Sequence, residues 1–158
     1  MNKATFVIRT TWSRPEPSVT ERFRGVPTAL VADTLGHGFG VLDHHIRPVW
    51  KGPSFVGPAL PVQTAPHDIL AVHAAAKFSR PGDVIVIATG RSMNAAVLGG
   101  MTTTLLGNAG IVAAVTDGVV RDLTDIEAKD PRRNNCCSFE VRNGGSWLLR
   151  HQADQPVV

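Results

Sequence analysis

Two apolar runs of strand length, separated by a stretch that suits one helix, constrain the fold of this chain most strongly. The runs cover residues 84–88 and 111–115. Unbroken apolar runs of this length are typical of strands that are covered on both faces of a sheet. Residues 89–110 are enough for a single crossover helix. The segment therefore predicts a βαβ unit with parallel strands and a right-handed crossing.

The crossover is interrupted by the glycine pair Gly99-Gly100. Two adjacent glycines inside a helix would cost about 2 kcal/mol relative to alanine. We therefore expect residues 90–98 to form a loop. The crossover helix should begin at Gly99 or Gly100 and end near Asn108.

Shorter elements are expected before this unit. The chain opens with an arm in which apolar residues 5–8 are followed by two prolines, a pattern typical of an edge strand or a loosely held extension. Further along, helix and turn signals predict helices over residues 18–24 and 27–35, short bent strands within 41–64 that include 55–56 and 60–62, and a helix over 65–79.

The composition narrows the range of functions. A length of 158 residues suits one domain with one core. Tyrosine is absent, aromatic residues make up 6% of the chain, and Lys and Arg form no stripe, so the sequence does not support a nucleic-acid surface. The formal net charge of +3 suits a small anionic ligand such as a carboxylate.

Two further features concern the compartment. Cys136 and Cys137 are adjacent, which is neither a metal-knuckle spacing nor a pair that readily forms a disulfide, so we expect ordinary thiols in a reducing environment. The N-terminus shows no signal pattern, and no apolar run approaches the roughly 18 residues that a bilayer span needs. These features predict a cytoplasmic protein without a membrane segment.

The segment after the second apolar run ends in Arg121-Asp122, which is the first candidate site. An arginine can hold an oxyanion through two parallel hydrogen bonds, and a neighbouring carboxylate can hold a hard divalent cation. Because loops after parallel strands meet at one edge of the sheet, we expect this pair near residues 99–102, whose N–H groups at a helix start favour a carboxylate. We call residues 99–102 the amide cradle. The plain alternatives are a surface ion pair at a helix start and a glycine pair that only permits close packing.

Five segments in order along the chain resemble the RraA-like family, which includes 4-hydroxy-4-methyl-2-oxoglutarate aldolases. They read Ala-Leu-Val-Ala-Asp-Thr-Leu-Gly at 29–36, Gly-Pro-Ala at 57–59, Pro-Gly-Asp-Val at 81–84, Gly-Gly-Met-Thr at 99–102 and Asp-Gly-Val-Val-Arg-Asp at 117–122. The resemblance implies an α/β fold of the swivelling ββα type around the central parallel βαβ unit, assembled as a homotrimer or hexamer. It divides the chain into an N-terminal arm (1–22), an RraA-like aldolase domain (23–128) and an atypical C-terminal tail (129–158).

The same resemblance implies a class II pyruvate aldolase. Such an enzyme cleaves 4-hydroxy-4-methyl-2-oxoglutarate to two pyruvates and decarboxylates oxaloacetate through the same pyruvate enolate. The residues that would bind the small keto-acid substrate are Gly99, Gly100, Met101, Thr102 and Arg121. The catalytic residues would be Arg121 and Asp122, with Asp122 as the ligand of Mg²⁺ or Mn²⁺. The site contains no lysine, which disfavours a Schiff-base route.

The chain departs from the family pattern at two places. Many members carry an acidic residue after the first glycine of the cradle, where it helps to order metal-bound water, and this chain has Gly100 there. Residues 129–158 do not match the strands that usually follow. The alternative function is a non-enzymatic regulator that binds a ribonuclease; the Arg121-Asp122 pair favours the enzyme, because the regulatory branch tends to lose it. An inactive paralogue is the third interpretation.

Overall fold

A five-stranded sheet forms the centre of the computed structural model, which describes residues 7–36, 40–43, 46–49, 54–129 and 138–141. The strands, in their order across the sheet, are β1 (Ile46–Pro48), β7 (Ser138–Val141), β5 (Ala113–Thr116), β3 (Val84–Ala88) and β2 (Ala59–Gln63). Neighbours from β7 to β2 are parallel, whereas β1 is antiparallel to β7. The arrangement confirms the expected α/β class with a parallel sheet.

The predicted βαβ unit consists of β3, helix α4 (Gly100–Asn108) and β5. Gly99 is the N-cap of α4, so the helix begins where the glycine pair indicated. The loop expected over 90–98 contains a further strand, β4 (Ala96–Leu98), which pairs in parallel with β6 (Val119–Val120) in a separate small sheet. Strands of two and three residues are too short to show a recognisable hydrophobic period, so the sequence did not predict this second sheet.

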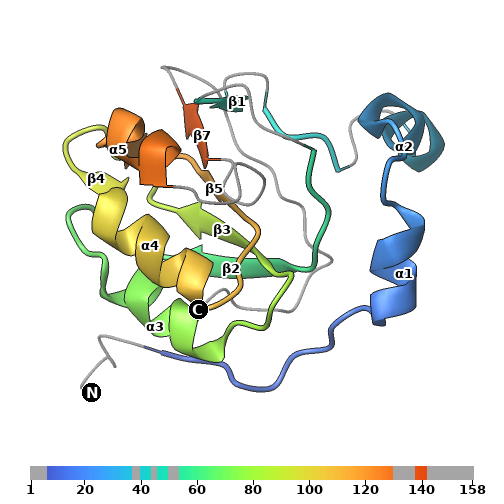
Figure 1. The fold of residues 1–158 in the computed structure, drawn as a ribbon, viewed down its shortest axis with the longest axis horizontal. Helices are drawn as coiled ribbons and strands as arrows, with labels where there is room; N and C mark the ends of the chain where they lie inside the picture. The colour runs from blue at the N-terminus through green and yellow to red at the C-terminus, as the bar shows by residue number, and fades with distance from the viewer. Residues whose placement is uncertain (1–6, 37–39, 44–45, 50–53, 130–137, 142–158) are drawn as a thin grey trace.

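The helices fall into two groups (Figure 1). Helices α3 (Leu70–Phe78), α4 and α5 (Leu123–Lys129) lie together on one side of the sheet, whereas α1 (Pro17–Arg22) and α2 (Thr28–Leu35) lie apart from it. No residue of α1 or α2 is buried. Among the described residues, none of the helices has the length and apolar character that crossing a bilayer requires.

Two apolar clusters pack on opposite faces of the sheet, and alternate residues of β3 contribute to each. The cluster beneath α3, α4 and α5 includes Val62, Val72, Ile85, Ile87, Val97, Leu98, Leu106, Val120 and Ile126. The cluster on the other face includes Ile46, Val84, Ala113 and Val115, with Phe55 and Val86 packed against it. The central strand is therefore covered on both faces, as its unbroken apolar run predicted.

The helix expected over 65–79 begins later, at Leu70. A turn takes the place of its first residues, because the Thr64 hydroxyl donates to the carbonyl of Asp68 and His67 adopts a left-handed backbone conformation (φ 67°). The Asp68 carboxylate then accepts the N–H of Leu70 at 2.8 Å. Side chains that bond to nearby backbone groups compete with the first turn of a helix, which explains the shorter element.

One other expectation differs from the structure, because residues 55–56, expected among the strands, form no strand. Residues 7–16 of the arm form neither helix nor strand, which contradicts an edge strand there but not the alternative of an extension. The arm is nevertheless attached to the body through Arg14, whose guanidinium pairs with Asp83, donates to the Phe78 carbonyl at 3.3 Å and lies 4.7 Å from the centre of the Trp12 ring. A charge pair with a buried carboxylate makes this attachment specific.

The segment after residue 128 contributes to the main sheet. Strand β7 lies within the segment that the sequence set apart as a tail, and it pairs with β5 on one side and with β1 on the other. Cys136 and Cys137 lie outside the described residues. The sheet is thus completed by residues whose sequence did not resemble the family.

Two of the family-like segments meet at the amino ends of β2 and β3. The Val84 N–H donates to the Pro58 carbonyl at 2.8 Å. A Cβ atom on Gly57 would lie 2.1 Å from the carbonyl oxygen of Gly82. Since backbone cannot move aside as a flexible side chain can, glycine is required at position 57 for packing.

We expect the G57A substitution to lower the free energy of unfolding by about 1–3 kcal/mol, the usual cost of overpacking a well-packed site. The matched control is G107A in α4, where an added Cβ would meet nothing within 4 Å. That change should stabilise the helix by about 0.5–1 kcal/mol. Urea unfolding followed by circular dichroism measures both. Equal stabilities of the G57A variant and the wild type would contradict the packing assignment.

Candidate active site

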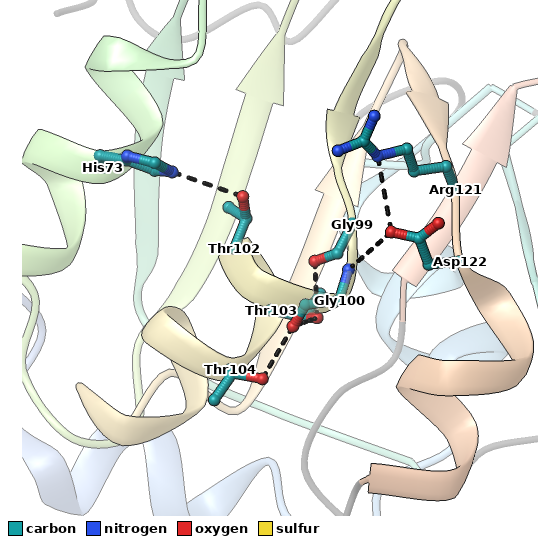
Figure 2. A network of polar contacts seen from close by, with 8 residues as sticks. All are labelled: His73, Gly99, Gly100, Thr102, Thr103, Thr104, Arg121 and Asp122. Atoms are coloured by element: carbon teal, nitrogen blue, oxygen red, sulfur yellow. Dashed lines mark hydrogen bonds and ion pairs between the residues drawn. The ribbon is translucent and has the colours of Figure 1, made fainter.

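The small sheet of β4 and β6 brings the two candidate segments together. β4 leads directly into Gly99-Gly100, and β6 leads directly into Arg121-Asp122 (Figure 2). The strands are parallel, and the Arg121 N–H donates to the Leu98 carbonyl at 3.0 Å. The cradle and the Arg-Asp pair are therefore side by side, in the loops that follow β3 and β5, as the rule for parallel sheets predicted.

The carboxylate of Asp122 joins the two segments. Its Oδ2 accepts the N–H of Gly100 at 3.2 Å and lies 3.5 Å from Nε of Arg121. Asp122 has a left-handed backbone (φ 61°), a conformation that Asp and Asn adopt more readily than most residues. Its carbonyl accepts the Ile126 N–H at 2.9 Å, which begins α5. The backbone thus turns at Asp122 so that the side chain faces the cradle while the main chain enters a helix.

Both charged side chains remain accessible to a ligand. The Arg121 side chain is 72% exposed and that of Asp122 is 44% exposed. An ion pair with this exposure contributes little to stability, because water screens it. Arg121 and Asp122 do lie at the start of a helix, as expected for the alternative of a simple surface ion pair. The hydrogen bond that Asp122 accepts from Gly100 distinguishes them from such a pair.

Gly99 is required by the space that Arg121 and Asp122 occupy. A Cβ atom at this position would lie 3.0 Å from both Nε of Arg121 and Oδ2 of Asp122. The backbone of Gly99 is extended (φ −160°), a conformation open to any residue. Glycine is therefore needed at position 99 because it has no side chain, and not because of its backbone freedom.

The first turn of α4 presents free donors. Among the described residues, the N–H groups of Met101 and Thr102 have no hydrogen-bond partner, as is usual at a helix start. The hydroxyl of Thr103 donates to the Gly99 carbonyl at 2.9 Å, and that of Thr104 donates to the Gly100 carbonyl at 2.7 Å. With the carbonyls engaged and the N–H groups open, the cradle favours an anion.

The structure also places His73 beside the amide cradle, although His73 was not among the candidate residues predicted from the sequence. Its Nε2 lies 3.4 Å from the Thr102 hydroxyl oxygen, so α3 reaches the cradle from the side opposite Arg121 and Asp122 (Figure 2). His73 is exposed, whereas Thr102 is buried. The contact joins residues on separate helices, and no motif or spacing in the sequence indicated it.

The donor set suits one kind of metal ion. The described part of the chain contains no group of three or more His, Cys, Asp or Glu side chains placed to hold a metal. Asp122 offers one partly exposed carboxylate. Mg²⁺ is commonly held by one or two carboxylates and completes its shell with water and substrate oxygens. The residues therefore fit a weakly held, substrate-assisted Mg²⁺ or Mn²⁺, and they do not fit a structural zinc ion.

Sequence comparisons identify relatives of the chain. Residues 28–132 match a family model described as "RraA-like: Aldolase/RraA". A curated protein of Halalkalibacterium halodurans, named "Putative 4-hydroxy-4-methyl-2-oxoglutarate aldolase", is 36% identical over 111 residues, which are 70% of this chain and 52% of that protein. The chain thus spans about half the length of the curated relative it matches.

Solved structures share the fold. Streptomyces coelicolor RraAS2, described as an unusual member of the RNase ES inhibitor RraA protein family, has a TM-score of 0.69 at 22% identity, with 93% of this chain and 71% of that chain covered. A protein of Geobacillus kaustophilus described as an S-adenosylmethionine:2-dimethylmenaquinone methyltransferase has a TM-score of 0.61 at 22% identity, with 73% and 68% covered. The names describe different activities on one fold, so function has to be argued from the site.

Proposed function

This chain belongs to the RraA-like family, and we propose that it is a metal-dependent carbon–carbon lyase acting on small keto acids. The substrate would be 4-hydroxy-4-methyl-2-oxoglutarate, cleaved to two pyruvates, and oxaloacetate would be decarboxylated at the same site. The named relative supports a lyase. The observation that carries the proposal is the junction at Asp122, where one carboxylate contacts both the amide cradle and the Arg121 guanidinium.

Substrate binding follows from the donors of the site. The N–H groups of Met101 and Thr102 bind the carboxylate next to the ketone of the substrate, with support from the partial positive charge at the start of α4. The Arg121 guanidinium binds the ketone oxygen through its planar set of N–H donors. Asp122 would hold Mg²⁺ or Mn²⁺, which when bound would supply Lewis-acid polarisation of the ketone.

Bond cleavage places negative charge on the ketone oxygen. In the aldol substrate, the bond between the carbons α and β to the ketone breaks. Its electron pair becomes the carbon–carbon double bond of the enolate, and the π pair of the ketone moves onto the ketone oxygen. The β-hydroxyl gives its proton to solvent water, so the departing carbon becomes the ketone of the second pyruvate. In oxaloacetate, the same electron movement releases carbon dioxide. Arg121 stabilises the resulting enolate in both reactions, because its charge lies where the charge develops. Solvent water, which reaches this exposed site, then protonates the enolate carbon and gives pyruvate.

The test is a coupled assay of pyruvate release from each substrate, with Mg²⁺ or Mn²⁺ and with EDTA. We expect release that depends on the metal and is abolished by EDTA. Reactions with metal but without protein are the control for oxaloacetate, since divalent cations alone promote its decarboxylation. If the folded protein releases no pyruvate from either substrate above that control, the proposed lyase is wrong.

A regulator that binds a ribonuclease is the second candidate function, supported by the fold shared with RraAS2. Its binding surface would not depend on the Arg121-Asp122 junction. Binding to a ribonuclease that survives substitution of both residues, in a protein without lyase activity, would favour the regulator.

For either function we propose self-association as a homotrimer or hexamer. Such an assembly would cover the exposed apolar residues of the α1–α2 region, which are Val19, Phe23, Val26, Leu30 and Leu35.

A further inference from the structure

Asp117 is a buried carboxylate that the mechanism above does not use. It follows β5 and is 4% exposed. Its Oδ1 accepts the N–H of Thr89 at 2.5 Å and the hydroxyl of Thr89 at 2.9 Å, and its Oδ2 accepts the N–H of Arg91 at 2.9 Å. No ion pair with Asp117 is formed among the described residues. A buried carboxylate is costly unless hydrogen bonds compensate it, so these three bonds hold it in place.

The bonds connect the starting points of the two segments that carry the site. Thr89 and Arg91 begin the segment that continues through β4 to the cradle, while Asp117 begins the segment that continues through β6 to Arg121. The two segments are also in contact at Gly118, where an added Cβ would lie 2.8 Å from Cγ2 of Thr89. Asp117 therefore fixes one segment against the other before either reaches the site.

The small sheet alone provides little to fix this alignment. β4 has three residues and β6 has two, and their register shifts between Ala96 and Leu98. Short strand pairs are marginally stable, and their register is weakly specified unless something else defines it. The alignment of β4 with β6 therefore needs a further contact, and one placed just after the carboxyl ends of β3 and β5 can provide it.

We propose that Asp117 is a positioning residue for the active site. Its carboxylate sets the alignment of the β4 and β6 segments, and so sets the contact of Asp122 with the Gly100 N–H, which lies at the far end of the same two segments. The catalytic consequence rests on the proposed lyase. The structural consequence is independent of it, because the alignment exists without substrate.

The test is the D117N variant, which keeps the shape of the side chain and replaces one oxygen by an NH₂ group. In either orientation of the amide, this group faces a backbone N–H, that of Thr89 or that of Arg91, and at least one bond is lost. The companion variants are T89V and T89S. T89V removes the hydroxyl bond to Asp117 and also the acceptor of the Ser92 N–H, whereas T89S keeps both. Amide hydrogen exchange by NMR, together with pyruvate release, is measured for all three and for the wild type.

We expect exchange of the Gly100 and Arg121 amides to become about tenfold faster in D117N, in line with the loss of one charge-assisted bond. Amides of the β3–β5 ladder, such as that of Val86, should keep their wild-type rates. Turnover should fall by about tenfold or more, since small misplacements of reacting groups are costly. T89V should show the same pattern to a smaller degree, and T89S should behave as the wild type.

Each of the other outcomes would overturn the proposal or one part of it. Unchanged exchange at Gly100 and Arg121 in D117N would overturn the proposal, as would faster exchange at all sites together, which indicates a purely structural role. Wild-type turnover in a D117N protein with the local exchange pattern would overturn the catalytic part. A wild-type chain that releases no pyruvate, but shows the local pattern in D117N, would remove the lyase and leave Asp117 as the residue that aligns the two segments.

Discussion

The D122N substitution is expected to reduce metal-dependent pyruvate release by about a hundredfold or more, the scale found when one group that stabilises developing charge is removed. Asparagine tolerates the left-handed backbone of position 122 and can still accept the N–H of Gly100, so the fold should be retained. What is lost is the negative charge that would hold the cation. D122A should have an effect at least as large, because it also removes the contact with the cradle.

Arg121 offers a complementary test of the same junction. R121A should reduce turnover by orders of magnitude, about as much as D122N. R121K keeps the charge but cannot reproduce the planar fork of donors, so it should restore only a small part of the rate. Full activity of R121K would show that the two-donor contact with the substrate is wrong, even if the lyase itself is real.

The matched control is the exposed pair of Glu21 and Arg24 near α1, with Nε and Oε1 2.7 Å apart. The hydrogen bond from Arg24 lowers the pKa of Glu21 from its ordinary value, which favours the charged form of the pair. It lies away from the cradle and the Arg121-Asp122 pair. E21Q and R24K should therefore keep wild-type turnover when compared at the same oligomeric state, because the pair lies in the α1–α2 region that self-association would cover. A similar loss there would mean that removing any surface charge affects the assay.

The position of the site was predictable from sequence because it depends on a topological rule. Two apolar runs defined parallel strands, and the loops after such strands meet at one edge, so Gly99-Gly100 and Arg121-Asp122 were expected to be neighbours. The structure places them side by side. Their roles in binding and catalysis stay predictions, which the substitutions above test.

The contacts that refine the site were not predictable in this way. The contact of His73 with Thr102 and the bonds of Asp117 to Thr89 are made by single side chains about 30 residues apart, with no repeating pattern in the sequence. Likewise, the late start of α3 depends on a turn in which Thr64 bonds to the backbone of Asp68. Hydrophobic periodicity identifies the buried and exposed faces of strands and helices. It does not identify which polar groups form hydrogen bonds across a loop.

Gly99 carries the second large prediction. G99A is expected to reduce turnover by about a hundredfold, because the new Cβ would lie 3.0 Å from both Nε of Arg121 and Oδ2 of Asp122 and so would displace them. The free energy of unfolding should change little, since the backbone at position 99 is extended and the displaced groups are partly exposed. Measuring pyruvate release and urea unfolding on the same preparations separates the two effects.

The control for G99A is G107A, the same substitution on the same helix, where the added Cβ meets nothing and activity should be unchanged. Full activity of G99A would mean that the placement of Arg121 and Asp122 against the cradle is not needed for catalysis. The double variant of G99A and D122N gives the sharper result. If Gly99 acts only by leaving room for the Arg121-Asp122 pair, G99A should add little once Asp122 has lost its charge, because residues that act as one unit are not additive.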